Sequence, residues 1–310
     1  MKILMTGSTG LVGTALGQEL QRAGHTVCRL VRPGTAVEKA RDAGGFDVNW
    51  NPATGELGGA AVGADAVVNL AGASIADGRW TAGRKQLLLA SRVDTTRALV
   101  RALSQMAARP RVLVSASGIG YYGSCGDQVL TEESPLGQDF LSHLGQEWEA
   151  EAAKAEALGI GVVRARFGII LARHGGALPR MVRPFLWGAG GKIGSGEQWM
   201  SWVTLQDVVA ILRFASENGA VRGPVNVVSP QPVRNSEFTR VLAETLHRPT
   251  LFPAPAFALR LLLGEMAEEL LLSSQRAMPA ALEKLGYRFL HPDLATALAA
   301  ILGTASHGQN

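Results

Sequence analysis

The chain carries near its start the stretch Lys2-Ile3-Leu4-Met5-Thr6-Gly7-Ser8-Thr9-Gly10-Leu11-Val12-Gly13. A short apolar run leads into three glycines that are spaced three residues apart. Apolar residues then recur at helical spacing through Leu20. The stretch therefore predicts a β-strand, a tight turn and an α-helix, in that order.

Each glycine of this turn meets a different physical need. Gly7 lets the chain reverse as it leaves the strand, Gly10 lets the backbone approach a diphosphate, and Gly13 lets the helix pack close to the sheet. A dinucleotide diphosphate would meet the free N–H groups and the positive end of the helix. The alternative is a glycine-rich turn without a ligand. The turn makes these residues candidates for cofactor binding: Gly7, Thr9, Gly10, Leu11 and Val12.

Composition indicates an ordinary globular protein. The 310 residues are 47% hydrophobic and 18% charged, and the formal net charge is +4. The basic residues are scattered, which argues against a nucleic-acid partner. Cys28 and Cys125 are too few for a disulfide framework or a metal site, so we expect reduced thiols, no metal and a cytoplasmic location. The apolar segment Ala256–Leu272 is interrupted by charges, so we expect a soluble protein without a membrane partner.

The second expected strand, within His25–Gly34, bears on the choice of cofactor. In a doubly wound sheet the end of this strand approaches the ribose of a bound dinucleotide. An acidic residue there favours NAD, whereas this strand ends at Arg32, which suits a 2′-phosphate. We therefore expect NADP(H), with Arg32 as a cofactor-binding residue. The alternative is that Arg32 is a solvated turn residue.

Strands and helices alternate over the first half of the chain, which predicts a parallel sheet. The strand near 64–72 ends in small residues that let the backbone pass close to a flat group, so Leu70, Ala71 and Gly72 are cofactor candidates.

After residue 172 the chain becomes glycine-rich and irregular, and it turns helical again from Asn235. We predict an α/β Rossmann-like doubly wound parallel sheet over 1–172, regaining a strand near 202–229. A smaller C-terminal α-rich substrate region follows over 173–303, and 304–310 form a frayed tail. The expected strands are 46–52, 64–72, 111–118 and 161–171, and the expected helices are 87–103 and 138–158.

Several segments together resemble the extended short-chain dehydrogenase/reductase superfamily. They are Thr6–Gly13, Asn69–Gly72 and Ser115–Gly123. A narrower resemblance is to the atypical epimerase family, the YfcH-like and SDR family 39U-like proteins, which have a C-terminal helical extension. It implies a Rossmann-like fold and NADP(H) binding. The residues that carry it include Gly78–Thr81, Lys85, Ser91-Arg92, Thr131–Glu133, Gly190–Gly196, Trp202-Val203, Asp207, Asn226–Pro230, Pro232–Asn235, Leu263–Glu265 and Gln275–Pro279.

The superfamily's usual catalytic pair is absent from this sequence. That pair is a Tyr with a Lys four residues later, in which the Lys lowers the pKa of the phenol that exchanges a proton. The chain has three tyrosines, and none is followed by Lys at that spacing. By position, the resemblance places Phe140 where the Tyr would be and Leu144 where the Lys would be. Neither side chain can exchange a proton, so the usual mechanism does not apply.

Other polar residues near the expected cleft are candidates for proton exchange. Ser117 lies close to the superfamily's usual Ser/Thr position, and Tyr121 follows the same strand. We take Ser117 and Tyr121 as catalytic candidates, while packing under the sheet edge is the alternative for Tyr121 and Tyr122. Arg92 is a candidate for a cofactor phosphate or ribose, or else a helix-surface arginine. Lys85, Lys192 and His143 are further polar residues of this region.

Two functions follow from these observations. The first is an NADP-dependent oxidoreductase or epimerase that acts on an unknown small substrate. The second is a non-catalytic NADP(H)-binding sensor or scaffold. The missing Tyr–Lys pair favours the second function, whereas the polar residues retained around the expected cleft favour the first, which we take as the main interpretation. The resemblance adds that some relatives are associated with cell or plastid division, and that relatives often form homodimers through the helices near 87–103 and 138–158.

Overall fold

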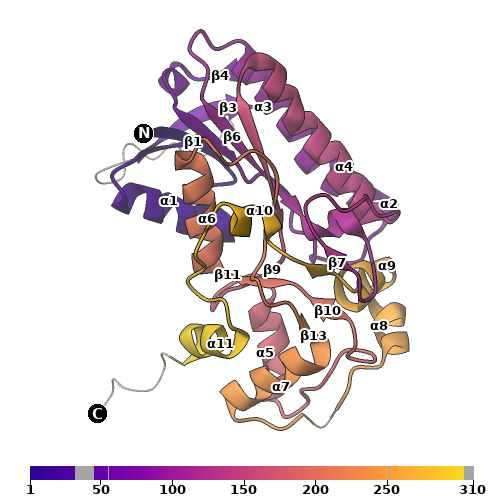
Figure 1. Cartoon of the computed structure of the whole chain (residues 1–310). Coiled ribbons are helices and arrows are strands. Elements are labelled where there is room, and N and C mark those ends of the chain that lie inside the picture. The colour runs from indigo at the N-terminus through magenta and orange to yellow at the C-terminus, as the bar shows by residue number, and fades with distance from the viewer. Residues whose placement is uncertain (32–44, 55, 251, 304–310) are drawn as a thin grey trace.

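A central sheet organises the fold. The computed structural model describes residues 1–31, 45–54, 56–250 and 252–303. Its eight-stranded sheet has the order β12-β8-β6-β5-β1-β2-β3-β4 (Figure 1). All neighbours are parallel except β3 and β4. The chain moves outward from β1 in both directions, which is the doubly wound, Rossmann-like order, so the predicted fold class is confirmed. The strands are β1 (Lys2–Thr6), β2 (Thr26–Val31), β3 (Gly45–Asn51), β4 (Glu56–Leu57), β5 (Ala66–Asn69), β6 (Val112–Gly118), β8 (Gly161–Phe167) and β12 (Gly223–Val227).

Strand register brings the site residues to one edge. Thr6 at the end of β1 lies opposite Asn69 at the end of β5, and Asn69 lies opposite Ser115 of β6. The strand order reverses between β1 and β5, and such a switch point opens a crevice outside the carboxyl ends of the strands. Gly7 follows β1 at this point. The fold therefore places the glycine turn where dinucleotides bind in this class of sheet.

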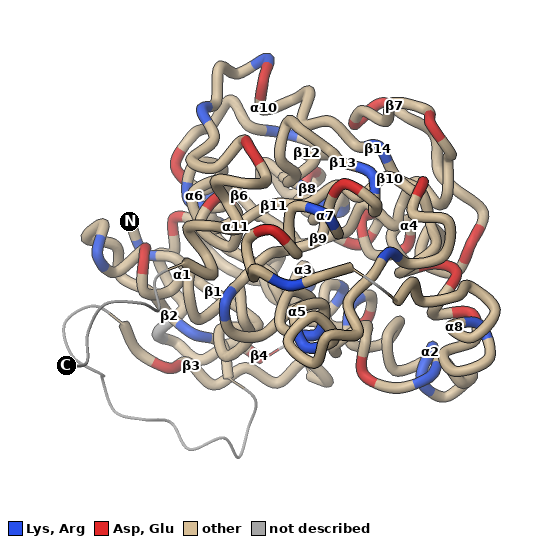
Figure 2. The backbone as a smooth tube through the Cα atoms, turned by 90° about the horizontal axis from the view of Figure 1, so that it is seen from below, with Lys and Arg blue, Asp and Glu red and all other residues tan. Residues whose placement is uncertain are grey.

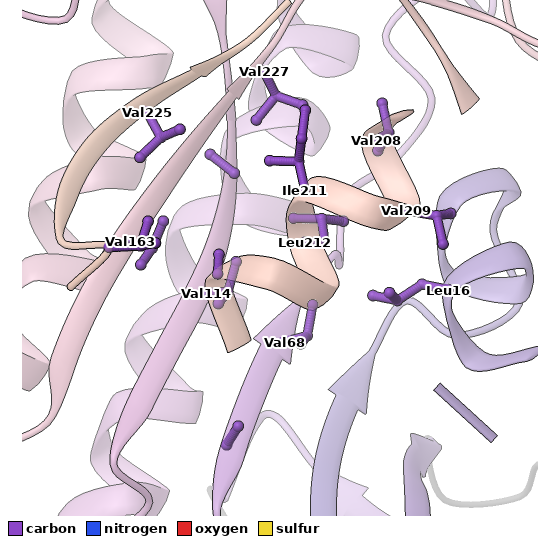
Figure 3. Close-up of a cluster of buried hydrophobic side chains, with 14 of the residues drawn as sticks. Leu16, Val68, Val114, Val163, Val208, Val209, Ile211, Leu212, Val225 and Val227 are labelled. Atoms are coloured by element: carbon purple, nitrogen blue, oxygen red, sulfur yellow. The ribbon is translucent and has the colours of Figure 1, made fainter. Parts of the chain in front are cut away.

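Helices cover both faces of the sheet. On one face, α1 and α6 pack on the valines of the strands, with Leu16 of α1 and Leu212 of α6 fully buried (Figure 3). On the other face, α3 and α4 close a second core that includes Leu99 and Leu113. A π-helical segment, Ala90–Asp94, joins α2 to α3. The helices of these layers are α1 (Leu11–Arg22), α2 (Ala82–Leu89), α3 (Thr95–Ser104), α4 (Phe140–Ala153) and α6 (Leu205–Glu217).

The strand predicted over 161–171 is interrupted. Gly168 separates β8 from β9 (Ile169–Leu171), and β9 leaves the main sheet to pair with β11 (Trp202–Thr204). A Cβ atom on Gly168 would lie 2.4 Å from the backbone oxygen of Ser201. Glycine is therefore required where the chain passes from one sheet to the next.

The C-terminal region lies beyond the carboxyl ends of the strands (Figure 1). The sequence predicts irregular structure after residue 172, but the helix α5 lies there, with Pro179 in its first turn, where proline is tolerated. β12 returns to the main sheet beside β8. Within the described residues, no helix combines the length and apolarity needed to cross a membrane. The remaining elements are β7 (Val129–Leu130), α5 (Leu178–Leu186), β10 (Trp199–Met200), β13 (Val233–Arg234), α7 (Asn235–Leu246), α8 (Ala256–Leu263), α9 (Glu265–Ala267), β14 (Arg276–Ala277), α10 (Ala280–Lys284) and α11 (Leu294–Leu302).

Candidate functional site

The three glycines of the first turn are not equivalent. Gly7 has a φ of +63°, and a Cβ atom there would lie 2.4 Å from the backbone oxygen of Leu70. A Cβ atom on Gly13 would lie 2.2 Å from the oxygen of Gly7. Both positions are therefore filled by the protein's own backbone. A Cβ atom on Gly10 would meet only the oxygen of Gly7, at 3.4 Å, so this position faces open space that a ligand can occupy.

The amino end of α1 is left free of side-chain caps. Its N-cap residue is Gly10, and no acidic side chain lies in the first turn. By contrast, Thr81 caps α2 and Asp139 caps α4, each accepting a hydrogen bond from a backbone N–H of the first turn. The first N–H groups of a helix lack partners inside it, so those near Leu11 are available to an anion. The cradle therefore fits a diphosphate.

A buried polar network holds the loop after β5 against this turn. The Thr6 hydroxyl donates to Asn69 Oδ1 at 2.7 Å and accepts from the backbone N–H groups of Leu70 and Ala71 at 3.1 and 3.2 Å. Asn69 Nδ2 in turn donates to Thr96 Oγ1 at 2.8 Å. The network fixes the backbone of residues 70–71 beside Gly7. Sequence reasoning missed the roles of Thr6 and Asn69, although a polar residue at the end of each buried strand was visible.

Arg92 lies directly behind this loop. A Cβ atom on Gly72 would lie 3.1 Å from Arg92 Cζ, and Arg92 Nη2 donates to the backbone oxygen of Ala73 at 2.9 Å. The guanidinium is 5.3 Å from the ring of Trp148 on α4, and the residue is only 9% exposed. Burial, with a smaller contribution from Arg84, lowers the pKa of Arg92 to about 10. Arg92 is therefore a buried residue behind the loop that follows β5 rather than a helix-surface arginine.

Ser117 takes part in a second buried network. Its hydroxyl donates to Glu149 Oε1 at 2.7 Å, and the side chain is 4% exposed. Glu149 on α4 is also bound by Arg166 of β8, through Nε at 2.7 Å and Nη2 at 2.8 Å. Sequence reasoning missed Glu149 and Arg166, because a glutamate in a helix and an arginine in a strand carry no signal of burial.

The two adjacent tyrosines have different surroundings. The Tyr122 hydroxyl donates to Asn226 Oδ1 at 2.7 Å and accepts from Arg166 Nη1 at 2.9 Å. Burial raises the pKa of Tyr122 to about 12. Tyr121 is half-buried, and its ring centroid lies 3.6 Å from Arg166 Cζ. Tyr122 is thus a buried residue whose hydroxyl is hydrogen-bonded on both sides, while Tyr121 is positioned by the contact between its ring and Arg166.

Charged side chains surround Phe140 at the start of α4, the position where the superfamily's usual tyrosine would stand. Lys85 Nζ lies 4.8 Å from the ring centroid of Phe140 and pairs with Glu265 at 2.5 Å. The carboxylate of Glu269 accepts from the backbone N–H groups of Phe140 and Leu141, at 3.3 and 2.9 Å. Burial, with the nearby Asp139 and Glu265 carboxyls, raises the pKa of Glu269 to about 7.

The remaining sequence candidates lie apart from this cluster or beyond the described residues. His143 and Lys192 are exposed, in α4 and in the loop before β10 respectively. Arg32 falls outside the described residues, so the structure does not place it.

Comparison with known proteins identifies the family. Residues 3–228 match the model of the NAD dependent epimerase/dehydratase family, and residues 254–301 match a domain of unknown function, DUF1731. The chain belongs to the NAD dependent epimerase/dehydratase family. An epimerase family protein of Mycobacterium bovis is 41% identical over 96% of this chain and 96% of its own length. A chloroplastic SDR39U1 homolog of Arabidopsis thaliana is 37% identical over 97% of this chain and 87% of its own length.

A solved structure extends this relationship. The human epimerase family protein SDR39U1, crystallised with NADPH, matches with a TM-score of 0.86 and 32% identity, over 98% of this chain and 100% of its own. The resemblance to 39U-like epimerase family proteins is therefore confirmed. The relative also carries the cofactor that the sequence predicts for this chain. Because the plant relative is chloroplastic, a cytoplasmic location stays a prediction.

Proposed function

We propose that this protein binds NADP(H) across the carboxyl edge of its sheet and acts as an oxidoreductase or epimerase on a small substrate. The observation that carries the proposal is the open position at Gly10, between two glycines whose places are filled by backbone. NADPH in the human relative supports the choice of nucleotide. In this proposal the cofactor is held by Gly7, Thr9, Gly10, Leu11, Val12, Leu70, Ala71 and Gly72, with Arg32 at the 2′-phosphate. Arg92 supports this loop from behind Gly72, through the backbone oxygen of Ala73.

The chain's own residues would then perform three tasks. The amino end of α1 offsets the charge of the diphosphate, since its N–H groups carry partial positive charge. Thr6 and Asn69 hold residues 70–71 in place through three hydrogen bonds. When bound, a nicotinamide cofactor supplies hydride transfer, and the protein supplies binding, orientation and a proton.

We assign the proton exchange to Tyr121. Phe140 stands at the position of the usual tyrosine and has no ionisable group. The Ser117 hydroxyl already donates to Glu149, so we assign it a positioning role through that carboxylate. The ring of Tyr121 is held against Arg166, which fixes its direction without using its hydroxyl. Among the described residues, no hydrogen bond engages the Tyr121 hydroxyl. A phenol held by its ring, with its hydroxyl available in this way, is suited to general acid–base work.

The test is NADPH oxidation followed by absorbance, with a panel of small aldehydes, ketones and sugar substrates. We expect turnover of at least one substrate, and a Tyr121→Phe variant that loses at least about tenfold in kcat while NADPH affinity is retained. Tyr287→Phe, which changes a phenol packed against Phe214, is the matched control. NADPH binding without turnover of any substrate would instead support the sensor or scaffold function. Equal turnover by the Tyr121→Phe protein would reject the assignment of Tyr121.

A further inference from the structure

Three arginines converge on the loop that follows β5. Arg92 donates to the backbone oxygen of Ala73 at 2.9 Å, and Arg84 Nη2 donates to that of Ser74. Arg180 Nη1 donates to the oxygen of Ala76 at 2.8 Å. The three come from the π-helical segment, α2 and α5, so the sheet domain and the C-terminal region both contribute. Basic positions on α2 and α5 are visible in Figure 2.

Positive charge exceeds negative charge at this loop. Asp77 is the carboxylate of the loop, and it pairs with Arg180 at 2.8 Å. Among the residues that the structure describes, neither Arg84 nor Arg92 forms a salt bridge with a carboxylate. The Asp77 carboxylate also interacts with the charge of Arg84, but at longer range than with Arg180, so one carboxylate faces three guanidinium groups and leaves an excess of positive charge. The proximity of Arg84 and Arg92 is also seen in the pKa of Arg92, which the charge of Arg84 helps to lower.

Both arginines also hold buried donors. Arg92 is 9% exposed, and its hydrogen bonds within the described residues go to uncharged oxygens of Leu88, Ser91 and Ala73. The Nε atom of Arg84 is buried and has no hydrogen-bond partner among the described residues. A buried cation without a counter-ion, and a buried N–H without an acceptor, both cost free energy. An oxyanion between the two groups would supply the missing charge and the missing acceptor.

We infer that Arg84 and Arg92 bind a compact oxyanion, a carboxylate or a phosphate, that belongs to the substrate. The inference rests on the proposed function and narrows its substrate to an anionic small molecule. The cofactor diphosphate is assigned to Gly10 and α1, and residues 70–72 lie between that turn and Arg92. Arg92 instead stacks on Trp148, one turn beyond Leu144 on α4, on the side of the missing Tyr–Lys pair. Guanidinium groups suit this task because their N–H donors match carboxylate and phosphate oxygens.

The test uses inorganic phosphate as the probe, with chloride at equal ionic strength as the reference. Thermal unfolding is measured with NADPH saturating, so that the site at Gly10 is filled. We expect phosphate to raise the Tm of the unaltered protein further. Arg84→Gln should weaken phosphate binding at least about tenfold, since it removes one charge-assisted contact. Arg101→Gln, on an exposed arginine of α3, should bind phosphate as the unaltered protein does.

Three outcomes would overturn the inference. One is an equal phosphate response in the Arg84→Gln and Arg101→Gln proteins. Another is no phosphate response with or without NADPH. The third is a response that NADPH abolishes, which would show that the oxyanion is the cofactor's own phosphate. Repeating the titration without cofactor in a Gly10→Leu background separates this inference from the cofactor proposal, because an Arg84-dependent response there requires no NADPH.

Discussion

Arg166 on β8 and Glu149 on α4 form a two-point ion pair, with Nε–Oε1 at 2.7 Å and Nη2–Oε2 at 2.8 Å. Both side chains are at most 5% exposed. The same guanidinium reaches the Tyr122 hydroxyl and lies over the ring of Tyr121, while the carboxylate also accepts from Ser117. One buried pair thus fixes both catalytic candidates that the sequence suggests.

Removing one partner of this pair should destabilise the fold strongly. Glu149→Ala leaves a buried guanidinium without its counter-charge, which costs about 3–5 kcal/mol. Urea unfolding measures this as a lower free energy of unfolding. Glu244→Ala, which breaks the exposed pair with Arg240, should cost no more than about 1 kcal/mol. Equal decreases in the free energy of unfolding of the two variants would show that the buried pair stabilises the fold no more than the exposed pair does.

The pH dependence of stability should report Glu269. Its folded pKa of about 7 is above the ordinary value of 4.5, so between these pH values the folded state holds a proton that the unfolded state lacks. The stabilisation is therefore full below about pH 4.5 and is lost as the pH rises through 7. Asp139 and Glu265 are the carboxyl groups that act on it, and Lys85 pairs with Glu265.

Thermal unfolding of the unaltered protein and of Glu269→Gln from pH 4.5 to pH 8.5 checks this prediction. The glutamine oxygen can still accept from the start of α4 but does not titrate. We expect the Tm of the unaltered protein to fall relative to the variant between pH 5 and 8, and to run parallel above that. Curves that stay parallel over the whole range would mean that Glu269 titrates near its ordinary pKa.

Gly10→Leu should abolish NADPH binding with little effect on the fold. The backbone at Gly10 has a φ of −76°, which any residue adopts, and a Cβ atom there meets a single protein atom at 3.4 Å. A leucine side chain would occupy the space assigned to the diphosphate, so the Kd for NADPH should rise more than about tenfold. Gly83→Leu, at an exposed helical position with no atom near its Cβ, is the control. Unchanged affinity in Gly10→Leu would place the cofactor elsewhere.

Arg32→Glu should change which nucleotide is preferred. A carboxylate would repel a 2′-phosphate and could accept from a 2′-hydroxyl, so NADPH should weaken far more than NADH. Paired titrations with both nucleotides give the ratio of the two affinities. If both weaken equally, Arg32 does not contact the 2′-phosphate.

The sequence predicts the central strands because apolar strand segments alternate with helical segments along the chain. It also predicts the first turn, because the spacing of the three glycines is visible within one short stretch. It does not predict the break at Gly168, since the reason for that glycine is the backbone of Ser201, more than thirty residues further along the chain. It also misses α5, because glycines and prolines surround this helix and hide its periodicity.

Some residues of the candidate site can likewise be predicted from the sequence, and others only from the fold. Gly10 and Leu70–Gly72 lie in short motifs of small residues. Such motifs show from the sequence alone that the backbone can come close to a bound group there. Glu149 and Arg166 become recognisable only when α4 packs on the sheet and brings their charges together. The Arg84–Arg92 pair likewise depends on how the loop 73–76 folds back onto α2 and the π-helical segment.

The most direct measurement of the central claim is a thermal-shift titration of the purified protein with NADPH, NADP+, NADH and NAD+. A ligand that binds only the folded state raises the Tm according to its concentration and affinity. We predict that NADPH and NADP+ raise the Tm at concentrations where NADH and NAD+ have little effect. If none of the four nucleotides changes the Tm, the glycine turn does not hold a nicotinamide dinucleotide, and the proposed function is wrong.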